Sequence, residues 1–555
     1  MPDLGVTAAN LAWMASCYPA YRSFHRAMLD PQTAQESILK KIVTRNASTA
    51  FGRSHGFPTI RNVRNFQEQV PVNTYDDLEP FIERIRAGEK NVLTSEQVHL
   101  FERTSGSSSA AKYIPYTDSL RREFQQAVRS WIFDLYRHDP KLLQGRSYWL
   151  ITPLSREKEI TSGGIPVGFE NDADYLGTFE RKIAEILFAV PGELAQVPDI
   201  ESSLYLTLRF LIQAEDLSLI SVWNPSYLCI LMERFDPWAD CLLEDLRHGT
   251  ATLPNALNLP PSLARRLRTQ PRRARILQQI LKRDGRLRPQ DLWPRLRLIS
   301  CWTSGAARQC LEEVKRLFPG VQIQGKGLLA TEGVATIPWT EAGGCLPALN
   351  SHFYEFLAND GPEVKRVHEL EANAEYSLLL TTSGGMYRYR LGDRVRVSHF
   401  HGRVPVLEFM GRDDGVSDLR GEKLSPAFVQ GCLSEALLET GVSVRFAMLA
   451  PQNQAVPGYV LYVECLTNPE PLGPALERRL MANPHYDYCR SLGQLGPLKV
   501  YRIAQNAQET YVDRCAELGQ RMGSIKPTSL HRSGGWEDFF IKAFVTHPQK
   551  ELAPC

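Results

Sequence analysis

Residues 101–112 read Phe-Glu-Arg-Thr-Ser-Gly-Ser-Ser-Ser-Ala-Ala-Lys, a run of hydroxyl side chains closed by a lysine. Residues 97–103 alternate apolar and polar side chains like a strand, and residues 118–137 carry apolar side chains at helical spacing. Thr117 and Asp118 are good capping residues for that helix. A strand, a loop of small donors and a helix form a common phosphate site. The spacing differs from a Walker loop, and an isolated Ser/Gly run is also typical of a solvated linker.

Length and composition indicate a globular protein of two or three domains. The chain has 555 residues, of which 43% are hydrophobic. Its 64 basic and 62 acidic residues give a formal net charge of +2, which is no signature of nucleic-acid or membrane binding. The arginine-rich stretch 265–297 has Leu and Ile at helical intervals and is typical of a solvated helical face. We therefore expect no nucleic acid and no membrane among the partners.

The cysteines and the N-terminus predict a cytoplasmic location. The 11 cysteines include no C-x-x-C pair and have the character of reduced thiols in a cytosolic protein. The N-terminus lacks the basic region of a secretory signal, and no uncharged apolar run is long enough to span a bilayer. The oligomeric state is not indicated by any pattern in the sequence.

The order of predicted elements indicates an α/β fold. Residues 1–96 have a helical pattern and are expected to cap the large domain. Residues 217–235 and 296–318 each have a strand, a loop and a helix, with breaks at Asn224-Pro225 and at 303–306. This alternation predicts a large N-terminal domain with mainly parallel sheets and helices on both faces. Ligands of such sheets bind at the carboxyl ends of the strands.

A hinge is expected between two domains of unequal size. Residues 411–423 are polar and rich in glycine, and hinges need residues that absorb large φ/ψ changes. The residues that follow mix strand and helix patterns. We therefore predict a large domain at residues 1–411 and a smaller α+β lid domain at residues 412–555.

Two further motifs carry groups suited to a nucleotide. In the segment 325–333, Thr331 and Glu332 follow a short strand. A carboxylate beside phosphate oxygens needs a cation between them, which makes Glu332 a suitable Mg²⁺ ligand. The segment 385–393 ends on Asp393, whose two carboxylate oxygens can accept from two ribose hydroxyls. Taken alone, each motif is more typical of a surface turn.

In this order, the motifs make the sequence similar to the acyl-acid amido synthetases, within the adenylate-forming superfamily. Plant members of this family conjugate jasmonate, auxin and benzoates to amino acids; the resemblance here is to a bacterial-type member. The matching segments are 104–112 for the phosphate loop, 303–305 for the adenine-side turn, 330–332 for the Ser-Ser-Glu motif, 350–356 for a segment between motifs and 387–393 for the ribose motif. Ser109-Ala110 replace glycines of the family's loop, which makes the loop stiffer.

The resemblance implies a ligase that uses ATP and Mg²⁺. It would convert a small carboxylic acid to an acyl-adenylate, release pyrophosphate, and pass the acyl group to an amine such as an amino acid. A lysine of the lid would meet the charge at the transferred phosphorus, and Lys526 and Lys423 are the candidates. We expect Lys526 and Glu332 to be catalytic, with Glu332 as metal ligand. The implied nucleotide-binding residues are Thr104, Ser105, Gly106, Ser107, Ser108, Lys112, Thr303, Gly305, Thr331, Asp393, Arg412 and Lys423.

The acyl-binding residues are scattered along the chain. The candidates are Trp149, Tyr205, Trp223, His352 and Tyr354. A histidine in such a segment more often packs than acts as a base. Two other functions stay open, namely a thioester-forming acyl-CoA ligase and a non-catalytic nucleotide-binding protein. Pyrophosphate release that depends on a carboxylic acid would exclude the non-catalytic protein, and the identity of the acceptor would distinguish the two ligases.

Overall fold

The computed structural model describes residues 3–540 except 104–111, 151–158, 169–177, 198, 255–258, 305–307, 359–360, 362, 413–416, 418, 420–421, 423, 453, 455, 492–494, 519 and 521–524. The chain divides into two compact units. The larger comprises Met1–Thr303, Cys310–Leu391 and Val395–Phe409, and the smaller comprises Ser304–Gln309, Gly392–Arg394 and Met410–Cys555. The domain limits and the hinge expected from the sequence stay predictions.

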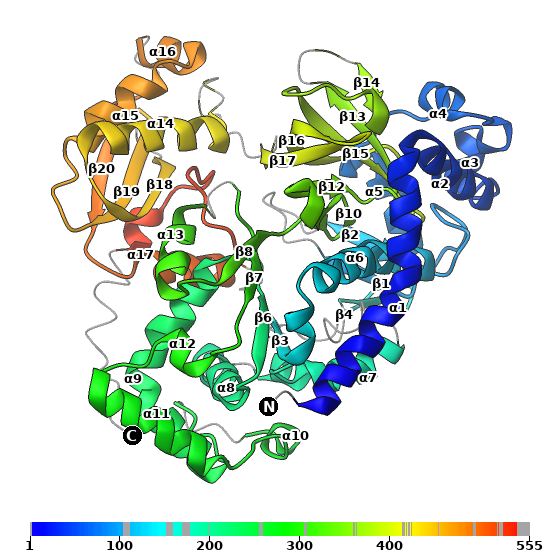
Figure 1. Cartoon of the computed structure of the whole chain (residues 1–555). Helices are drawn as coiled ribbons and strands as arrows, with labels where there is room; N and C mark the ends of the chain where they lie inside the picture. Colours follow the sequence, from blue (N-terminus) through cyan, green and yellow to red (C-terminus); the bar gives the residue numbers. More distant parts are fainter. Residues whose placement is uncertain are drawn as a thin grey trace. The chain divides into compact units, whose positions relative to one another are not determined.

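Helices form the N-terminal part of the larger unit. Each buries one apolar face, as Trp13, Cys17 and Phe24 do on α1. Figure 1 shows α1 running beside α6, with which it is in contact. The N-terminal helices are α1 (Leu4–Leu29), α2 (Pro31–Arg45), α3 (Ala50–Ser54), η1 (Phe57–Thr59), α4 (Val63–Gln69) and α5 (Tyr75–Arg86).

A hairpin and a long helix flank the segment 104–111. The strands β1 (Leu100–Arg103) and β2 (Tyr113–Tyr116) pair antiparallel, and α6 (Asp118–His138) follows them. The Thr117 hydroxyl accepts from the Leu120 backbone N–H at 3.2 Å, which confirms the predicted start of this helix. The sheet is completed by β5 (Pro166–Val167) and β4 (Glu159–Ile160).

The predicted parallel sheet is present. It consists of β3 (Arg146–Trp149), β6 (Leu217–Ser221), β7 (Leu298–Cys301) and β8 (Gln322–Gly325), all parallel and in that order. Every residue of β6 and β7 is buried, as expected for strands covered on both faces. The neighbouring helices are η2 (Pro140–Gln144), α7 (Thr178–Leu187), η4 (Gly192–Gln196), α8 (Ile200–Gln213), α9 (Ser226–His248), α10 (Pro261–Ala264), α11 (Pro271–Asp284), α12 (Pro289–Leu292) and α13 (Arg308–Leu317).

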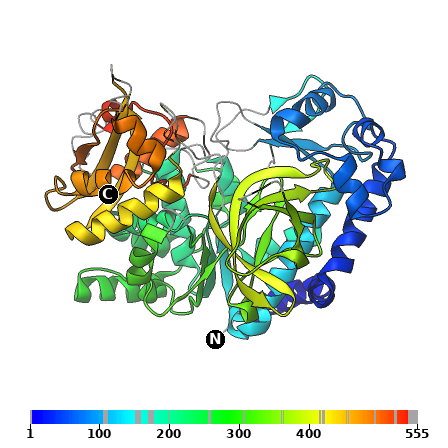
Figure 2. The ribbon, with the colours of Figure 1, turned by 90° about the horizontal axis from the view of Figure 1, so that it is seen from above.

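A second large sheet differs from the parallel one. Its order is β11-β12-β17-β16-β15-β13-β14, and the pairs β11·β12, β12·β17, β13·β14 and β13·β15 are antiparallel. Short connections join β11 to β12 and β13 to β14 and leave no room for crossover helices, so these two pairs are antiparallel. Figure 2 shows its yellow-green strands beside the blue and cyan N-terminal helices, with which they share one core. The strands and 3-10 turns here are β9 (Leu329–Ala330), β10 (Gly333–Val334), β11 (Thr336–Trp339), η6 (Thr340–Ala342), β12 (Gly344–Pro347), β13 (Phe353–Ala358), β14 (Val364–Arg366), η7 (Val367–Glu369), β15 (Glu375–Thr381), β16 (Tyr389–His401) and β17 (Val404–Arg412).

The smaller unit has the predicted α+β character. Its sheet has the order β18-β19-β20, formed by Val444–Gln452, Gly458–Cys465 and Lys499–Ile503, and its helices are α14 (Pro426–Thr440), α15 (Leu472–Leu480), α16 (Pro484–Ser491) and α17 (Ala507–Glu517). Alternate residues of β18 enter different cores: Ala447 and Leu449 pack with α14 and α15, and Phe446 and Met448 pack with α17. No helix among the described residues is long and apolar enough to cross a membrane.

Candidate active site

Tyr389 connects two of the predicted site residues. Lys112, which follows the segment 104–111, donates from Nζ to the Tyr389 hydroxyl at 3.4 Å. The Tyr389 hydroxyl donates in turn to Glu332 Oε1 at 3.3 Å. Tyr389 and Glu332 are both buried. A cation and a carboxylate from separate motifs thus lie on either side of one phenol. The sequence placed Tyr389 in a ribose motif, and its side-chain role was not predicted.

The backbone around Tyr389 is fixed on both sides. Arg388 has a φ of 44°, in the left-handed region that side-chain-bearing residues rarely adopt. Its Nε donates to Glu355 Oε2 at 3.0 Å, and burial raises the pKa of the Glu355 carboxyl. The Asn73 backbone N–H donates to the Arg388 carbonyl at 3.0 Å, and the Arg390 N–H donates to the Asn73 carbonyl at 2.8 Å. The orientation of Tyr389 is therefore determined by residues far away in the sequence.

His352 supports the turn that carries Glu332. Its Nε2 accepts from the Val334 backbone N–H at 3.1 Å, which leaves Nδ1 to donate to Glu123 Oε2 at 3.0 Å. A Cβ at Gly333 would lie 2.8 Å from His352 Nε2, so the ring fills the space behind the turn. Because His352 is fully buried and both ring nitrogens have protein partners, we leave it out of the acyl site and assign it a positioning role.

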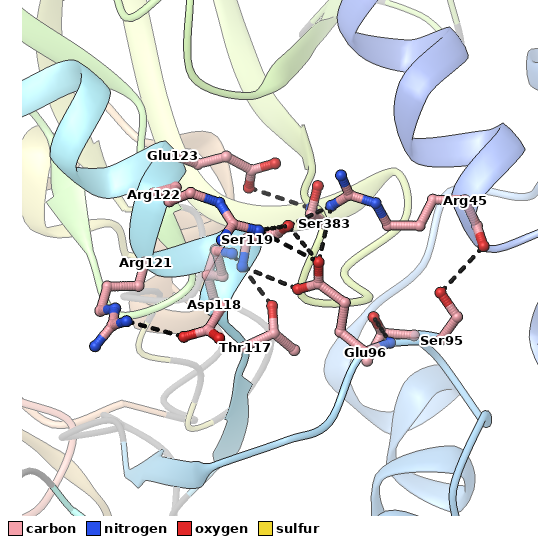
Figure 3. A network of polar contacts seen from close by, with 12 residues as sticks. Arg45, Ser95, Glu96, Thr117, Asp118, Ser119, Arg121, Arg122, Glu123 and Ser383 are labelled. Atoms are coloured by element: carbon pink, nitrogen blue, oxygen red, sulfur yellow. Dashed lines mark hydrogen bonds and ion pairs between the residues drawn. The ribbon is translucent and has the colours of Figure 1, made fainter.

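Polar contacts also fix the start of α6, which follows the phosphate-loop segment (Figure 3). Glu96 accepts from the Ser119 backbone N–H at 2.9 Å and from the Ser119 hydroxyl at 2.6 Å. Arg45 donates to the same carboxylate at 3.1 Å. One turn along the helix, Glu123 accepts from the Ser383 backbone N–H at 3.2 Å. These contacts connect α6 to the N-terminal helices and to the segment that follows β15.

The remaining described nucleotide candidates have structural neighbours. The Thr331 carbonyl accepts from the Tyr116 hydroxyl at 2.8 Å. Thr303 follows β7 and lies against the end of β8, since a Cβ at Gly325 would come within 2.5 Å of Thr303 Oγ1. Asp393 is buried on β16. The roles of these residues toward a nucleotide stay predictions.

Other candidates lie outside the described residues. These are Thr104, Ser105, Gly106, Ser107, Ser108, Gly305 and Lys423, together with the side chain of Arg412. Lys526 is described and exposed, between the buried residues Ile525 and Pro527 in the smaller unit. Its carbonyl accepts from the Tyr511 hydroxyl at 3.0 Å, so the backbone that presents Lys526 is held in place.

Two of the acyl candidates come together around a lysine that was not predicted. Nζ of Lys326 lies 4.7 Å from the ring centre of Trp223 and 5.6 Å from that of Trp149. The same amine donates to Ser221 Oγ at 2.7 Å. Desolvation lowers the pKa of Lys326 to about 7. The feature of the sequence that could have indicated this lysine is its position between Gly325 and Gly327, directly after a strand.

The other two aromatic candidates pack in the protein interior. The Tyr205 hydroxyl donates to Asp245 Oδ2 at 2.5 Å, and its ring packs edge-on to Trp238. The Tyr354 hydroxyl donates to the Val334 carbonyl at 2.7 Å. Both tyrosines are almost completely buried, and their hydroxyls are satisfied by protein groups. We therefore leave both out of the acyl site.

Comparison with protein families and with a curated relative gives matches over most of the chain. The GH3 family N-terminal domain matches residues 20–323, the GH3 family central domain matches residues 345–412, and the GH3 family C-terminal domain matches residues 429–534. An indole-3-acetic acid-amido synthetase of Arabidopsis thaliana, GH3.3, is 24% identical over 531 residues, which cover 89% of this chain and 88% of that relative.

Solved structures of similar fold include two ligases. The GH3.15 acyl acid amido synthetase, in complex with 2,4-DB, matches with a TM-score of 0.82 and 18% identity over 95% of this chain and 96% of that chain. A 2-hydroxyisobutyryl-CoA ligase, in the postadenylation state with R3-HIB-AMP, matches with a TM-score of 0.51 and 12% identity over 85% of each chain. These likenesses confirm the predicted α/β fold with its smaller C-terminal domain.

Proposed function

Because this chain belongs to the GH3 family, we propose that it is an ATP-dependent acyl-acid amido synthetase, a ligase that forms an amide bond. It adenylates a small carboxylic acid and then transfers the acyl group to the amine of an amino acid. The observation that carries this proposal is the chain of contacts from Lys112 through Tyr389 to Glu332. It brings together a cation suited to phosphate, a phenol and a carboxylate suited to a metal ion, each from a separate motif.

In the first step, the substrate carboxylate attacks the α-phosphorus of ATP, and the bond to pyrophosphate breaks. Lys112 would bind phosphate oxygens together with the predicted loop residues 104–108. Glu332 would hold Mg²⁺, which would neutralise charge on the leaving pyrophosphate. Among the described residues, no three His, Cys, Asp or Glu side chains cluster as a metal site. A single buried carboxylate suits a cation that takes its other ligands from phosphates and water.

In the second step, the amine attacks the acyl carbonyl and AMP leaves with the electron pair of the broken bond. The amine loses a proton in this step, and no serine or cysteine nucleophile is required. Asp393 would accept hydrogen bonds from the ribose, and Thr303 with Gly305 would line the adenine. The Tyr389 hydroxyl orients Glu332 by donating to it.

Pyrophosphate release and product mass together test this proposal. The purified protein should release pyrophosphate from ATP only when a suitable carboxylic acid is present, in a screen of aryl and alkyl acids. Mass spectrometry with mixed amino acids should then show an amide. If coenzyme A gives a thioester and no amide is formed, the protein is a CoA ligase. If none of the acids supports pyrophosphate release, the protein is non-catalytic.

Glu332→Gln is expected to lower the adenylation rate at limiting Mg²⁺ by at least about tenfold, because even second-shell changes at metal sites cost about 10–100-fold. The amide preserves the side-chain shape and can still accept from Tyr389, but it is a weaker ligand. Raising Mg²⁺ should therefore restore part of the activity. The measurement is pyrophosphate release against Mg²⁺ concentration.

Glu341→Gln is the matched control for that variant. It is the same substitution, placed at an exposed residue of the turn η6. Its Mg²⁺ dependence should equal that of the wild type. If Glu332→Gln also equals the wild type at limiting Mg²⁺, Glu332 is a structural turn residue and not a metal ligand.

A further inference from the structure

Lys326 lies at the carboxyl end of the parallel sheet, among the ends of its strands. It directly follows β8, while Trp149 and Ser221 are the last residues of β3 and β6. The Lys326 amine donates to Ser221 Oγ at 2.7 Å. The carboxyl edge of a parallel sheet is where α/β proteins bind ligands. A cation at this edge therefore has a position suited to ligand binding.

Three indole rings surround this amine. Nζ lies 4.7 Å from the ring centre of Trp223 and 5.6 Å from those of Trp131 and Trp149. Trp131 is buried on α6, whereas Trp149, Trp223 and Lys326 are each half-buried. The faces of the indole rings attract an ammonium group but leave it without an anion.

Among the residues that the structure describes, no anion is seen to influence the Lys326 ammonium. Among the described residues, the titratable group that influences its pKa is the Cys301 thiol, whose own pKa burial raises to about 12. A thiol with that pKa is neutral at physiological pH. Desolvation accordingly lowers the pKa of Lys326 to about 7. An anionic ligand would supply the missing charge and restore the ammonium form.

The reacting carboxylate is not suited to be that anion. Pairing with an ammonium lowers the nucleophilicity of a carboxylate, and this group has to attack the α-phosphorus of ATP. A second anionic group of the acyl substrate can supply this charge and leave the reacting carboxylate unpaired. Trp149 and Trp223 are half-buried indoles, and aromatic side chains of this kind favour an aromatic body between the two groups.

We propose that Lys326, Trp149 and Trp223 select the acyl substrate, and that this substrate is an aromatic acid with a second anionic group. The inference rests on the proposed function and names the substrate class of the same enzyme. Lys326 pairs with the second anion, and the indole rings stack on the aromatic body. The first carboxylate stays available for adenylation.

The test compares matched acids in the pyrophosphate-release reaction. Benzoate and phenylacetate are measured against their ortho, meta and para carboxylated derivatives, with wild type, Lys326→Met and Lys326→Arg. The wild type should prefer at least one dicarboxylate by about tenfold to a hundredfold in kcat/KM, the range expected of a charged hydrogen bond. Lys326→Met should lose this preference, measured as the ratio of kcat/KM on the dicarboxylate to kcat/KM on the monocarboxylate, while Lys326→Arg should retain it.

A titration without ATP separates this inference from the proposed function. The dicarboxylate should quench tryptophan fluorescence in wild type and in Lys326→Arg, and at least about tenfold more weakly in Lys326→Met. If the quenching is seen but no acid supports pyrophosphate release, the amido synthetase proposal fails and the anion site stands. Equal kcat/KM for mono- and dicarboxylates in the wild type, or an undiminished preference in Lys326→Met, would overturn the inference.

Discussion

Lys526→Ala is expected to lower the adenylation rate by roughly 10²–10³-fold, the range found for other positioned donors, while ATP affinity stays close to that of the wild type. An ammonium near the α-phosphate offsets anionic charge that grows only as the carboxylate attacks. Interactions made only in the transition state change kcat and kcat/KM together. The measurement is the single-turnover rate of acyl-adenylate formation, beside ATP binding by calorimetry.

Backbone and neighbouring contacts hold the loop that carries Lys526. Lys526 is exposed between the buried residues Ile525 and Pro527, and its carbonyl is held by the Tyr511 hydroxyl at 3.0 Å. Tyr511 in turn stacks on Trp536, with ring centres 5.3 Å apart. The Tyr511 hydrogen bond is made to the Lys526 backbone, so this contact is available to the alanine variant as well.

One control variant, one variant of the second candidate lysine and one assay of the second half-reaction accompany Lys526→Ala. Lys499→Ala removes another exposed lysine of the same unit and should have the wild-type rate. Lys423→Ala tests the second candidate of the lid. Lys526→Ala should still convert a supplied acyl-adenylate to amide. Weaker ATP binding with an unchanged adenylation rate would refute the assignment, and equal losses in both half-reactions would mean that the loop has a structural role.

Local patterns were sufficient to predict most of the fold. The cap at Thr117 and the apolar spacing that follows it predict α6, and the strand–loop–helix patterns of residues 217–235 and 296–318 predict β6 and β7. The antiparallel character of the second large sheet was missed because pairing direction depends on which strands become neighbours. That arrangement is set by the core shared with the N-terminal helices, which are far away in the sequence.

The site was predicted less completely, for a related reason. The order of the motifs predicted Lys112 and Glu332 as site residues. The phenol between them belongs to Tyr389, which lies more than fifty residues after Glu332. The environment of Lys326 is built from segments at residues 131, 149, 221 and 223, none of them near it in the sequence. Charge and aromatic character can be read from a sequence, whereas burial and partners cannot.

Arg388→Met is expected to destabilise the protein by about 3–5 kcal/mol, because it leaves the buried Glu355 carboxylate without its ionic partner. The Arg388 and Glu355 side chains are 6% and 1% exposed, and their Nε–Oε2 distance is 3.0 Å. The same guanidinium donates to the Val70 carbonyl at 2.7 Å and to the Gln67 carbonyl at 3.0 Å. The free energy of unfolding in denaturant measures the loss, and an intact m-value would show that two-state behaviour is retained.

The pH dependence of this loss distinguishes an unpaired charge from simple loss of packing. Burial already raises the pKa of Glu355, and removal of Arg388 should raise it further. A folded-state pKa above the unfolded value means that the folded protein binds the extra proton, so the variant loses stability as pH rises. The deficit relative to wild type should therefore be smaller at about pH 5 than at about pH 8. Adding Glu355→Gln should recover part of the stability and remove the pH dependence. An equal deficit at both pH values, unchanged by Glu355→Gln, would show that the ion pair is not what Arg388 contributes.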